Sequence, residues 1–145
     1  MRLRPATSQD APAIAVILRT CFRVSLPFLP ELHTAAEDLA FVSGRLMAEN
    51  AVWVAELEDA VVGYVAFRDD WIEHLFIHPD RQGQGIGPAL LAKALADGRP
   101  KQLWTFQQNT RARRFYEARG FRVVEFTDGA GNEEKTPDVR YLWTP

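Results

Sequence analysis

The sequence predicts an α/β fold with one mixed sheet and helices on its faces. Segments with the alternation typical of strands and segments with helical spacing of apolar residues follow one another along the chain. No internal repeat or linker interrupts this alternation. A length of 145 residues, of which 47% are hydrophobic, is sufficient for one packed core. We therefore expect a single domain over residues 1–145.

The N-terminal half is expected to contain two helices and four strands. Thr7 with Asp10, and Thr34 with Glu37, have the spacing of a capping box ahead of apolar residues at helical intervals. Two prolines in segment 24–33 predict a loop between these helices. The expected helices carry residues 14–22 and 34–47, and the expected strands are 2–5, 51–57, 61–68 and 71–78.

The C-terminal half is expected to continue with two helices and three strands. Pro79 ends the strand before it, and Gly98 and Pro100 mark the end of a helix. Gly120 closes the next helix, and a polar loop at 128–137 precedes the last strand. The expected helices are 85–97 and 109–118, and the expected strands are 102–107, 121–126 and 138–143.

Charge is distributed unevenly along the chain. The formal net charge of −2 argues against a general nucleic-acid binder. Between residues 99 and 122, however, seven basic residues accompany a single acid, Glu117. This concentration is typical of a site for an anionic ligand of limited size, and a solvated helix face has the same composition. We expect no nucleic-acid partner.

The cysteine and histidine content narrows the class further. Cys21 is the only cysteine, which excludes a disulfide framework, and its place on the apolar side of the first helix predicts a buried thiol. Of the three histidines, His33 is distant in sequence and His74 and His78 are four residues apart, and no metal site is expected. No apolar run approaches the ~20 residues of a membrane span. We expect a cytoplasmic protein with no membrane partner.

A glycine-rich loop between a strand and a helix is the most informative segment. Gly83, Gly85 and Gly87 follow Pro79, and Pro88 suits the first turn of the helix. Glycines let backbone amides approach a ligand, and the first amides of a helix attract a phosphate. The loop lacks the lysine of a P-loop and the spacing of a dinucleotide-binding fingerprint. A tight strand-to-helix turn without a ligand is the alternative interpretation.

Two blocks of the sequence resemble one family. Segment 82–87, QGQGIG, resembles the Q/R-x-x-G-x-G/A loop of the GNAT superfamily of N-acetyltransferases. Segment 103–121, LWTFQQNTRARRFYEARGF, resembles the strand–Asn–helix–Tyr–Gly-Phe segment of the same family. Both blocks stand in the family's order. The resemblance implies a GNAT-like mixed, mostly antiparallel central sheet of six to seven strands flanked by about four helices.

The resemblance also implies a reaction and a cosubstrate. Acetyl-CoA would supply an acetyl group to a primary amine by direct attack in a ternary complex, with no metal. The glycine loop would bind the pyrophosphate, and the preceding strand would pair with the pantetheine arm and stabilise the oxyanion. Basic residues near the loop and on the following helix would meet the phosphates, but the ~100° step between helical neighbours prevents all of them from facing one way. The implied cofactor-binding residues are Leu75, Phe76, Ile77, Gln82, Gly83, Gln84, Gly85, Ile86, Gly87, Asn109 and Arg113.

Tyr116 is the expected general acid. It matches the tyrosine that many family members place beside the CoA sulfur. A tyrosine, with an ordinary pKa near ~10, stays protonated at neutral pH and can donate to the departing thiolate. The alternative is a structural ring that packs against Phe115 and Phe121.

The general base is expected to be Glu73 or His74. Glu73 lies where some family members carry a catalytic Glu, and His74 has the more suitable ordinary pKa. Strand alternation predicts that they point to opposite faces, so only one would face the acceptor directly. A base acting through water, or no base, is also common in the family. His33 and Trp71 are the expected acceptor-binding residues, and the other tryptophans are expected in the core.

The acceptor is expected to be a small-molecule or protein amine. Glu133 and Glu134 of the polar loop 128–137 suit a cationic acceptor, and a solvated hairpin explains them equally. The alternative function is a non-catalytic acyl-CoA-binding sensor or regulatory module. A homodimer is possible through an exposed edge strand near the C-terminus.

Overall fold

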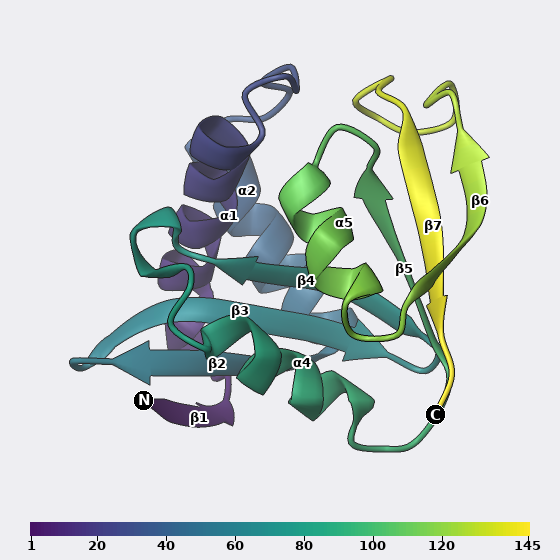
Figure 1. The fold of residues 1–145 in the computed structure, drawn as a ribbon. Helices are drawn as coiled ribbons and strands as arrows, with labels where there is room; N and C mark the ends of the chain where they lie inside the picture. Colours follow the sequence, from purple (N-terminus) through teal and green to yellow (C-terminus); the bar gives the residue numbers. More distant parts are fainter.

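The computed structural model describes residues 1–145 and contains one sheet of seven strands with helices on both faces (Figure 1). The strand order is β1-β2-β3-β4-β5-β7-β6, and every neighbouring pair is antiparallel except β4 with β5. The predicted mixed, mostly antiparallel sheet of six to seven strands is therefore confirmed. The strands are β1 (Arg2–Pro5), β2 (Ala51–Leu57), β3 (Ala60–Arg68), β4 (Trp71–Ile77), β5 (Lys101–Phe106), β6 (Arg122–Thr127) and β7 (Asp138–Trp143).

Four helical segments flank the sheet, as the sequence predicted. The second of them was expected to be a regular α-helix, but it contains a π-helical stretch between α2 and α3. None of these helices combines the length and the apolar character that crossing a bilayer requires. The helices are α1 (Ala11–Ser25), α2 (Ala35–Phe41) continuing through the π-helix (Val42–Leu46) into α3 (Met47–Glu49), α4 (Ile86–Leu95) and α5 (Thr110–Glu117).

Both predicted capping boxes are present. The Thr34 hydroxyl accepts from the Glu37 amide at 3.1 Å, and the Glu37 carboxylate accepts from the Thr34 amide at 2.9 Å. These bonds satisfy amides that the start of α2 leaves without intrahelical partners. The Thr7 and Asp10 box begins a short 3-10 helix (Ser8–Asp10), and α1 follows directly. Local sequence therefore determines where both N-terminal helices begin.

Side-chain alternation along the strands divides the core into two parts. Val54 and Tyr64 are fully buried against α1 and the π-helical stretch on one face of the sheet. Ala55 and Val65, their neighbours in the chain, are fully buried against α4 and α5 on the other face. Figure 1 shows the same division, with α1 and α2 behind the sheet and α4 and α5 in front of it.

The sheet opens between β4 and β5. These parallel strands pair only at Trp71 and Gln102, and beyond this point they diverge toward their carboxyl ends (Figure 1). Lys101 is fully buried where the strands meet, and its Nζ donates to the Asp69 carbonyl oxygen at 2.5 Å and to the Asp97 carboxylate at 2.9 Å. Lys101 thus links the turn after β3 to the segment after α4 at the base of the opening. The opening positions the candidate site.

A β-bulge in β4 lies inside this opening. Ala66 of β3 pairs with His74, whereas its neighbour Phe67 pairs with Ile72, so Glu73 is the extra residue on β4. A bulge breaks the strict alternation of side chains along a strand. The prediction that Glu73 and His74 face opposite sides rested on that alternation.

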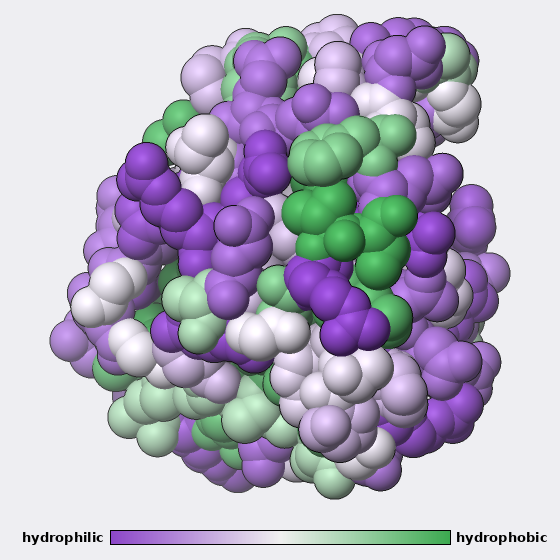
Figure 2. Space-filling model, turned by 45° about the vertical axis from the view of Figure 1, so that its right-hand side comes forward, coloured by the Kyte–Doolittle hydropathy of each residue, from purple (hydrophilic) through white to green (hydrophobic).

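The β6 strand forms one edge of the sheet and carries an apolar surface (Figure 2). Val124 and Phe126 of this strand are 40% and 57% exposed. Trp104 of β5 is 43% exposed, which contradicts the expectation that it belongs to the core. It remains exposed because the helices that cover β1–β4 do not extend over this face of β5.

Candidate active site

The larger of two cavities in the opening has a volume of about 490 Å³. It lies between β4, the glycine loop, the first turn of α4 and one side of α5, and Cys21 and Leu26 close it from the region of α1. Nine of the residues predicted to bind a cofactor line it. They are Leu75, Phe76, Ile77, Gln82, Gly83, Gly85, Ile86, Gly87 and Asn109.

The glycine loop presents backbone amides to this cavity. Gly83 and Gly85 have φ angles of 77° and 80°, and Gly85 is the N-cap of α4. An added Cβ at either position would meet no atom within 4 Å, so these glycines are needed for their backbone conformation. Amides in the first turn of a helix lack intrahelical partners and lie at the positive end of the dipole. This geometry suits an anionic group such as a phosphate.

The exposed edge of β4 supplies further backbone groups. The His78 amide donates to the Val62 carbonyl at 2.8 Å, so even-numbered residues of β4 form the ladder with β3. The alternation of an antiparallel ladder then directs the N–H and C=O groups of Leu75 and Ile77 toward the opening. The Ile77 carbonyl oxygen accepts there from the Cys21 thiol at 3.2 Å. The Leu75 backbone is therefore available to an extended ligand.

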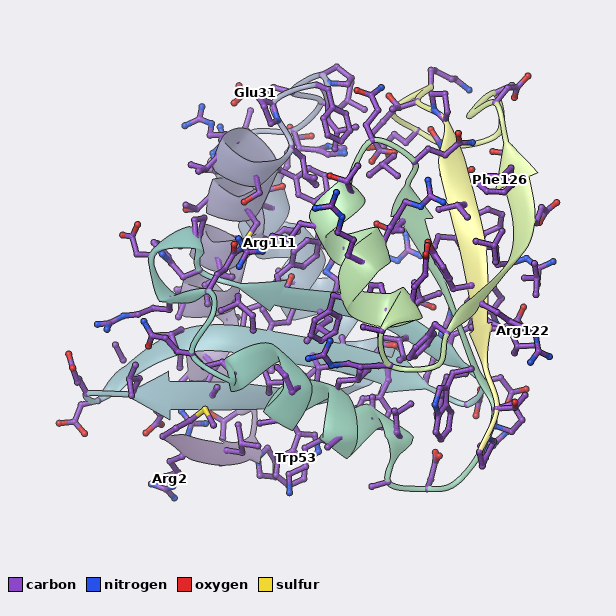
Figure 3. All side chains as sticks on the ribbon, in the orientation of Figure 1. Arg2, Glu31, Trp53, Arg111, Arg122 and Phe126 are labelled. Atoms are coloured by element: carbon purple, nitrogen blue, oxygen red, sulfur yellow. The ribbon has the colours of Figure 1, made fainter.

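Three arginines give the larger cavity a basic wall. Arg81, Arg111 and Arg119 line it, from the loop before α4 and from α5 and its C-terminal end. Figure 3 shows Arg111 on the side of α5 that faces the loop before α4. The Arg119 guanidinium lies 3.9 Å from the centre of the Phe115 ring, which holds it against the cavity wall. The predicted anionic ligand of limited size fits this charge.

The structure corrects the placement of Arg113 and Gln84. The Arg113 Nε donates to the Tyr141 hydroxyl at 3.0 Å, and the guanidinium carbon lies 5.5 Å from the centre of the Phe126 ring. Arg113 therefore faces β6 and β7, because two helical steps turn it away from the side that carries Arg111. Gln84 is exposed and does not line the cavity.

A smaller cavity of about 90 Å³ lies between the diverging strands β4 and β5. Glu73 and His74 both line it, because the bulge removes the alternation that would separate them. Trp104 and Phe106 form its β5 wall. The residues that line both cavities, and so mark their junction, are Leu26, Leu75, Phe76, Asn109, Ala112 and Tyr116.

The surroundings of Tyr116 are compatible with both of its predicted roles, a packed structural ring and a general acid. Its ring packs 5.2 Å from the rings of Phe115 and Phe121. Its hydroxyl has no hydrogen-bond partner within the chain. The only fully buried side-chain polar atom without a hydrogen bond is Asn50 Oδ1, so the Tyr116 hydroxyl is not fully buried. The hydroxyl is therefore open to the cavities that the residue lines. Burial raises the pKa of Tyr116 and keeps its proton in place at neutral pH.

Glu73 and His74 have different surroundings. Glu73 is exposed, and its carboxylate accepts from Arg68 Nε at 3.3 Å. The His74 ring contacts Phe41 and Phe76, and its Nδ1 lies 2.8 Å from the Tyr64 hydroxyl. Burial lowers the pKa of His74 to about 4. His74 is therefore neutral at neutral pH, with one ring nitrogen already bonded.

Asn109 is the N-cap of α5. Its side-chain oxygen accepts from the Ala112 amide at 3.2 Å, which satisfies an unpaired donor at the start of the helix. Asn109 also lines both cavities. It fixes the end of α5 that lies beside the junction.

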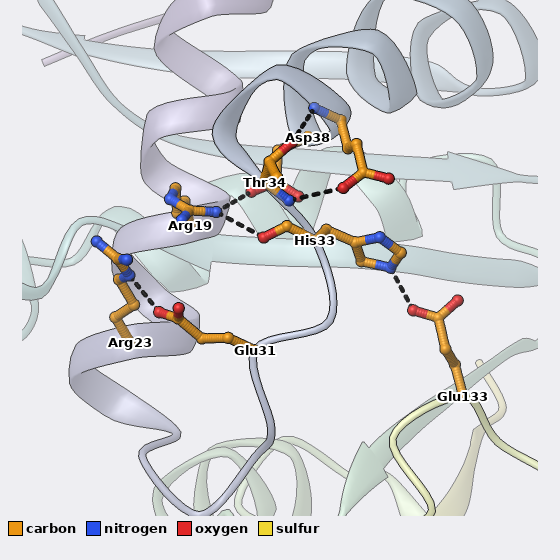
Figure 4. Close-up of polar contacts among 8 residues, drawn as sticks. Arg19, Arg23, Glu31, His33, Thr34, Asp38 and Glu133 are labelled. Carbon is orange, nitrogen blue, oxygen red and sulfur yellow. Dashed lines mark hydrogen bonds and ion pairs between the residues drawn. The ribbon is translucent and has the colours of Figure 1, made fainter.

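His33 and Trp71 lie outside both cavities. The His33 ring bonds to the Glu133 carboxylate, which links the α1–α2 loop to the β6–β7 loop (Figure 4). Glu133 raises the pKa of His33. Arg19 Nη1 donates to the His33 carbonyl oxygen at 3.0 Å, so the loop is held from both sides. Trp71 lies where β4 and β5 still pair, before the strands separate.

Some wall residues were not anticipated from the sequence. Phe22 and Leu26 at the end of α1, and Trp104 and Phe106 on β5, line the smaller cavity. Aromatic and aliphatic residues in predicted helices and strands indicate a core, and nothing local to them shows that β4 and β5 separate. The i, i+4 spacing of Arg111, Phe115 and Arg119 was the one usable signal for the basic wall.

The glycine loop, the free edge of β4 and the arginines give the larger cavity the features of a site for an extended anionic ligand. The sequence model of the acetyltransferase (GNAT) domain matches residues 48–123. An uncharacterized N-acetyltransferase of Archaeoglobus fulgidus is 35% identical over 129 residues, which cover 71% of this chain and 87% of that protein. The peptidyl-lysine N-acetyltransferase YjaB of Salmonella typhimurium is 29% identical over 125 residues, which cover 86% and 85% of the two chains.

Solved structures have the same fold. The structure of YncA, an acetyltransferase from Salmonella typhimurium with its cofactor acetyl-CoA, matches with a TM-score of 0.74 at 22% identity, covering 98% of this chain and 91% of that one. The chain belongs to the GNAT superfamily of N-acetyltransferases. It is an acetyl-CoA-dependent acyltransferase.

Proposed function

We propose that this chain transfers the acetyl group of acetyl-CoA to a primary amine by direct attack within a ternary complex. The observation that carries the proposal is the junction of the two cavities at Tyr116. A donor in the larger cavity and an acceptor in the smaller one would meet at this residue. Holding both reactants together converts a bimolecular step into an effectively unimolecular one.

The residues of the larger cavity fit acetyl-CoA, which supplies the acetyl group as a thioester. The amides around Gly83 and Gly85 would hold the pyrophosphate. The free backbone groups of Leu75 would pair with the pantetheine arm. Arg111 and Arg119 would meet the remaining phosphate charge.

Two residues at the junction would manage the protons. An amine acceptor arrives protonated at neutral pH, and Glu73 is the carboxylate that lines the acceptor cavity. Glu73 therefore takes the proton, directly or through a water molecule. The Tyr116 hydroxyl keeps its proton until the thiolate departs, and then donates it. His74 is a poor base because Nδ1 is bonded to Tyr64 and burial lowers its pKa to about 4.

The test is acetyl-CoA consumption against a panel of amines that contains lysine peptides, peptides with a free N-terminus and small amines. Mass spectrometry of the products identifies the acetylated nitrogen. Transfer to any primary amine supports the proposal. Tight binding of CoA by calorimetry without turnover of any amine would instead indicate an acyl-CoA sensor.

The role of Glu73 needs a matched control. Glu125 of β6 is also an exposed strand glutamate, and it pairs with Arg140 at 3.1 Å away from both cavities. The Glu73→Gln variant is expected to lower kcat about 100-fold at neutral pH, whereas Glu125→Gln leaves it unchanged. Equal rates for the two variants would remove Glu73 from the mechanism.

A further inference from the structure

The pair formed by Tyr64 and His74 fixes the proton of a histidine inside the smaller cavity. Tyr64 is fully buried, and its hydroxyl has no partner other than His74 Nδ1. If His74 Nδ1 carried the proton, it would donate to the tyrosine oxygen, and the buried tyrosine O–H would then have no acceptor. An unsatisfied buried donor costs about 1–3 kcal/mol. The hydroxyl therefore donates to Nδ1, and the proton of the neutral ring lies on Nε2.

The Nε2–H group has no partner within the chain. Nε2 is not fully buried, because Asn50 Oδ1 is the only fully buried side-chain polar atom without a hydrogen bond. Nε2 therefore keeps contact with open space, and the cavity that His74 lines is the smaller one. A neutral donor of fixed orientation is thus available there.

None of the other polar side chains that line that cavity, Thr105, Asn109 and Tyr116, hydrogen-bonds to this donor. The walls near His74 are mainly apolar or aromatic and include Phe22, Phe76 and Trp104. The Glu73 carboxylate also lines the cavity, but it is exposed and accepts from Arg68 Nε. A substrate that fills the cavity without an acceptor group would leave Nε2–H unsatisfied.

We propose that Tyr64 holds His74 as a neutral hydrogen-bond donor whose Nε2–H binds an oxygen that the acceptor carries next to its amine. The acceptor is then an α-amino carbonyl compound, such as an amino-acid amide or the N-terminus of a peptide, and not a plain alkylamine or a lysine side chain. This inference rests on the proposed function, because it assigns the smaller cavity to the acceptor. His74 is a specificity-determining residue, and Tyr64 is its positioning residue.

Nitrogen NMR of the resting protein tests the arrangement without any turnover. The chain has three histidines, so the ring signals are few and can be assigned by substitution. At neutral pH, His74 is expected as the neutral Nε2–H form. Tyr64→Phe removes the hydroxyl and leaves the ring, and a mixture of both neutral forms is expected. A protonated Nδ1 in the unmodified protein, or no change in Tyr64→Phe, overturns the proposal.

Two acceptors of similar size test the specificity. Alaninamide carries a carbonyl oxygen next to its amine, and sec-butylamine lacks it. The two amines also differ in pKa, so the informative quantity is how the ratio of their kcat/KM values changes on substitution. In His74→Asn, the side-chain oxygen replaces Nδ1 toward Tyr64 and the Nε2 donor is lost. The alaninamide preference is expected to fall about tenfold, the value of one hydrogen bond.

His74→Gln is the conservative counterpart, because its amide nitrogen reaches the position of Nε2. It is expected to keep more of the alaninamide preference than His74→Asn, with the difference in the KM of the acceptor and not of acetyl-CoA. An unchanged ratio in His74→Asn overturns the proposal.

A binding measurement distinguishes failure of this inference from failure of the proposed function. If no amine is turned over, the His74 Nε2 signal is followed while alaninamide or sec-butylamine is added. A shift with alaninamide alone supports the donor role, and identical responses to both amines overturn it.

Discussion

The burial of His74 predicts that this residue makes the protein less stable in acid over a defined pH range. The folded state lowers the pKa of His74 to about 4, whereas the unfolded chain keeps the ordinary histidine value of 6.5. Between these values the unfolded state binds more protons than the folded state. The free energy of unfolding therefore falls as the pH drops through 6.5, and this loss ends near the folded value of about 4.

The magnitude follows from the two pKa values. At about pH 7.5 the ring is neutral in both states and contributes almost nothing. At about pH 5 most unfolded chains carry the proton and few folded chains do, which gives a loss of about 2 kcal/mol in the free energy of unfolding. His33 acts in the opposite direction, because Glu133 raises its pKa and folding then favours its protonated form. The pH dependence of the free energy of unfolding of the unmodified protein is therefore the sum of such contributions.

Urea unfolding of the unmodified protein and of His74→Asn over this pH range isolates the contribution of His74 to the free energy of unfolding. The variant cannot bind a proton at this position, and its side-chain oxygen can still accept from Tyr64. The difference between the two proteins is expected to shrink by about 2 kcal/mol from about pH 7.5 to about pH 5. His33→Gln is the control, because it should change the slope in the opposite sense. Parallel curves for the unmodified protein and His74→Asn would refute the argument.

Three further substitutions test other parts of the structure. Tyr116→Phe keeps the packed ring, so kcat should fall about 100-fold with little change in stability or in the KM of acetyl-CoA; an unchanged kcat would exclude the acid role. Gly85→Ala and Gly98→Ala both force an alanine into a positive φ with open space around it, at 80° and 72°. Each should cost about 1 kcal/mol of stability, but only Gly85→Ala should raise the KM of acetyl-CoA, and equal values would argue against the loop site. Lys101→Ala should lower the free energy of unfolding by about 3 kcal/mol, and a loss below about 1 kcal/mol in urea unfolding would show that this lysine does not hold the base of the opening.

The parts of the fold that could be predicted are those that a short segment of the sequence determines by itself. The boxes formed by Thr7 with Asp10 and by Thr34 with Glu37 place helix starts because each box satisfies backbone amides within four residues. The glycine loop was also predictable, because glycine adopts a positive φ without the steric cost that other residues incur. The π-helical stretch at Val42–Leu46 was not, since it arises from how one helix continues against the sheet.

The candidate site was predictable along one strand and loop only. Most residues expected around the glycine loop line the larger cavity because strand, loop and helix are consecutive in the chain. Arg113 was misplaced because its direction depends on how α5 is rotated against β6 and β7. The aromatic wall of Trp104 and Phe106 escaped notice because it exists only where β4 and β5 separate.

The bulge in β4 changes what two adjacent residues can do. On a regular strand, Glu73 and His74 would face opposite sides, and one of them would be irrelevant to the acceptor. The extra residue at Glu73 gives both side chains access to the same cavity. They are not equivalent there, because Glu73 is exposed, whereas the Nδ1 of His74 is bonded to the Tyr64 hydroxyl. In the proposed mechanism, this backbone irregularity gives proton transfer to Glu73 and acceptor recognition to His74, and substitutions at the two positions should affect kcat and the preference between acceptors independently.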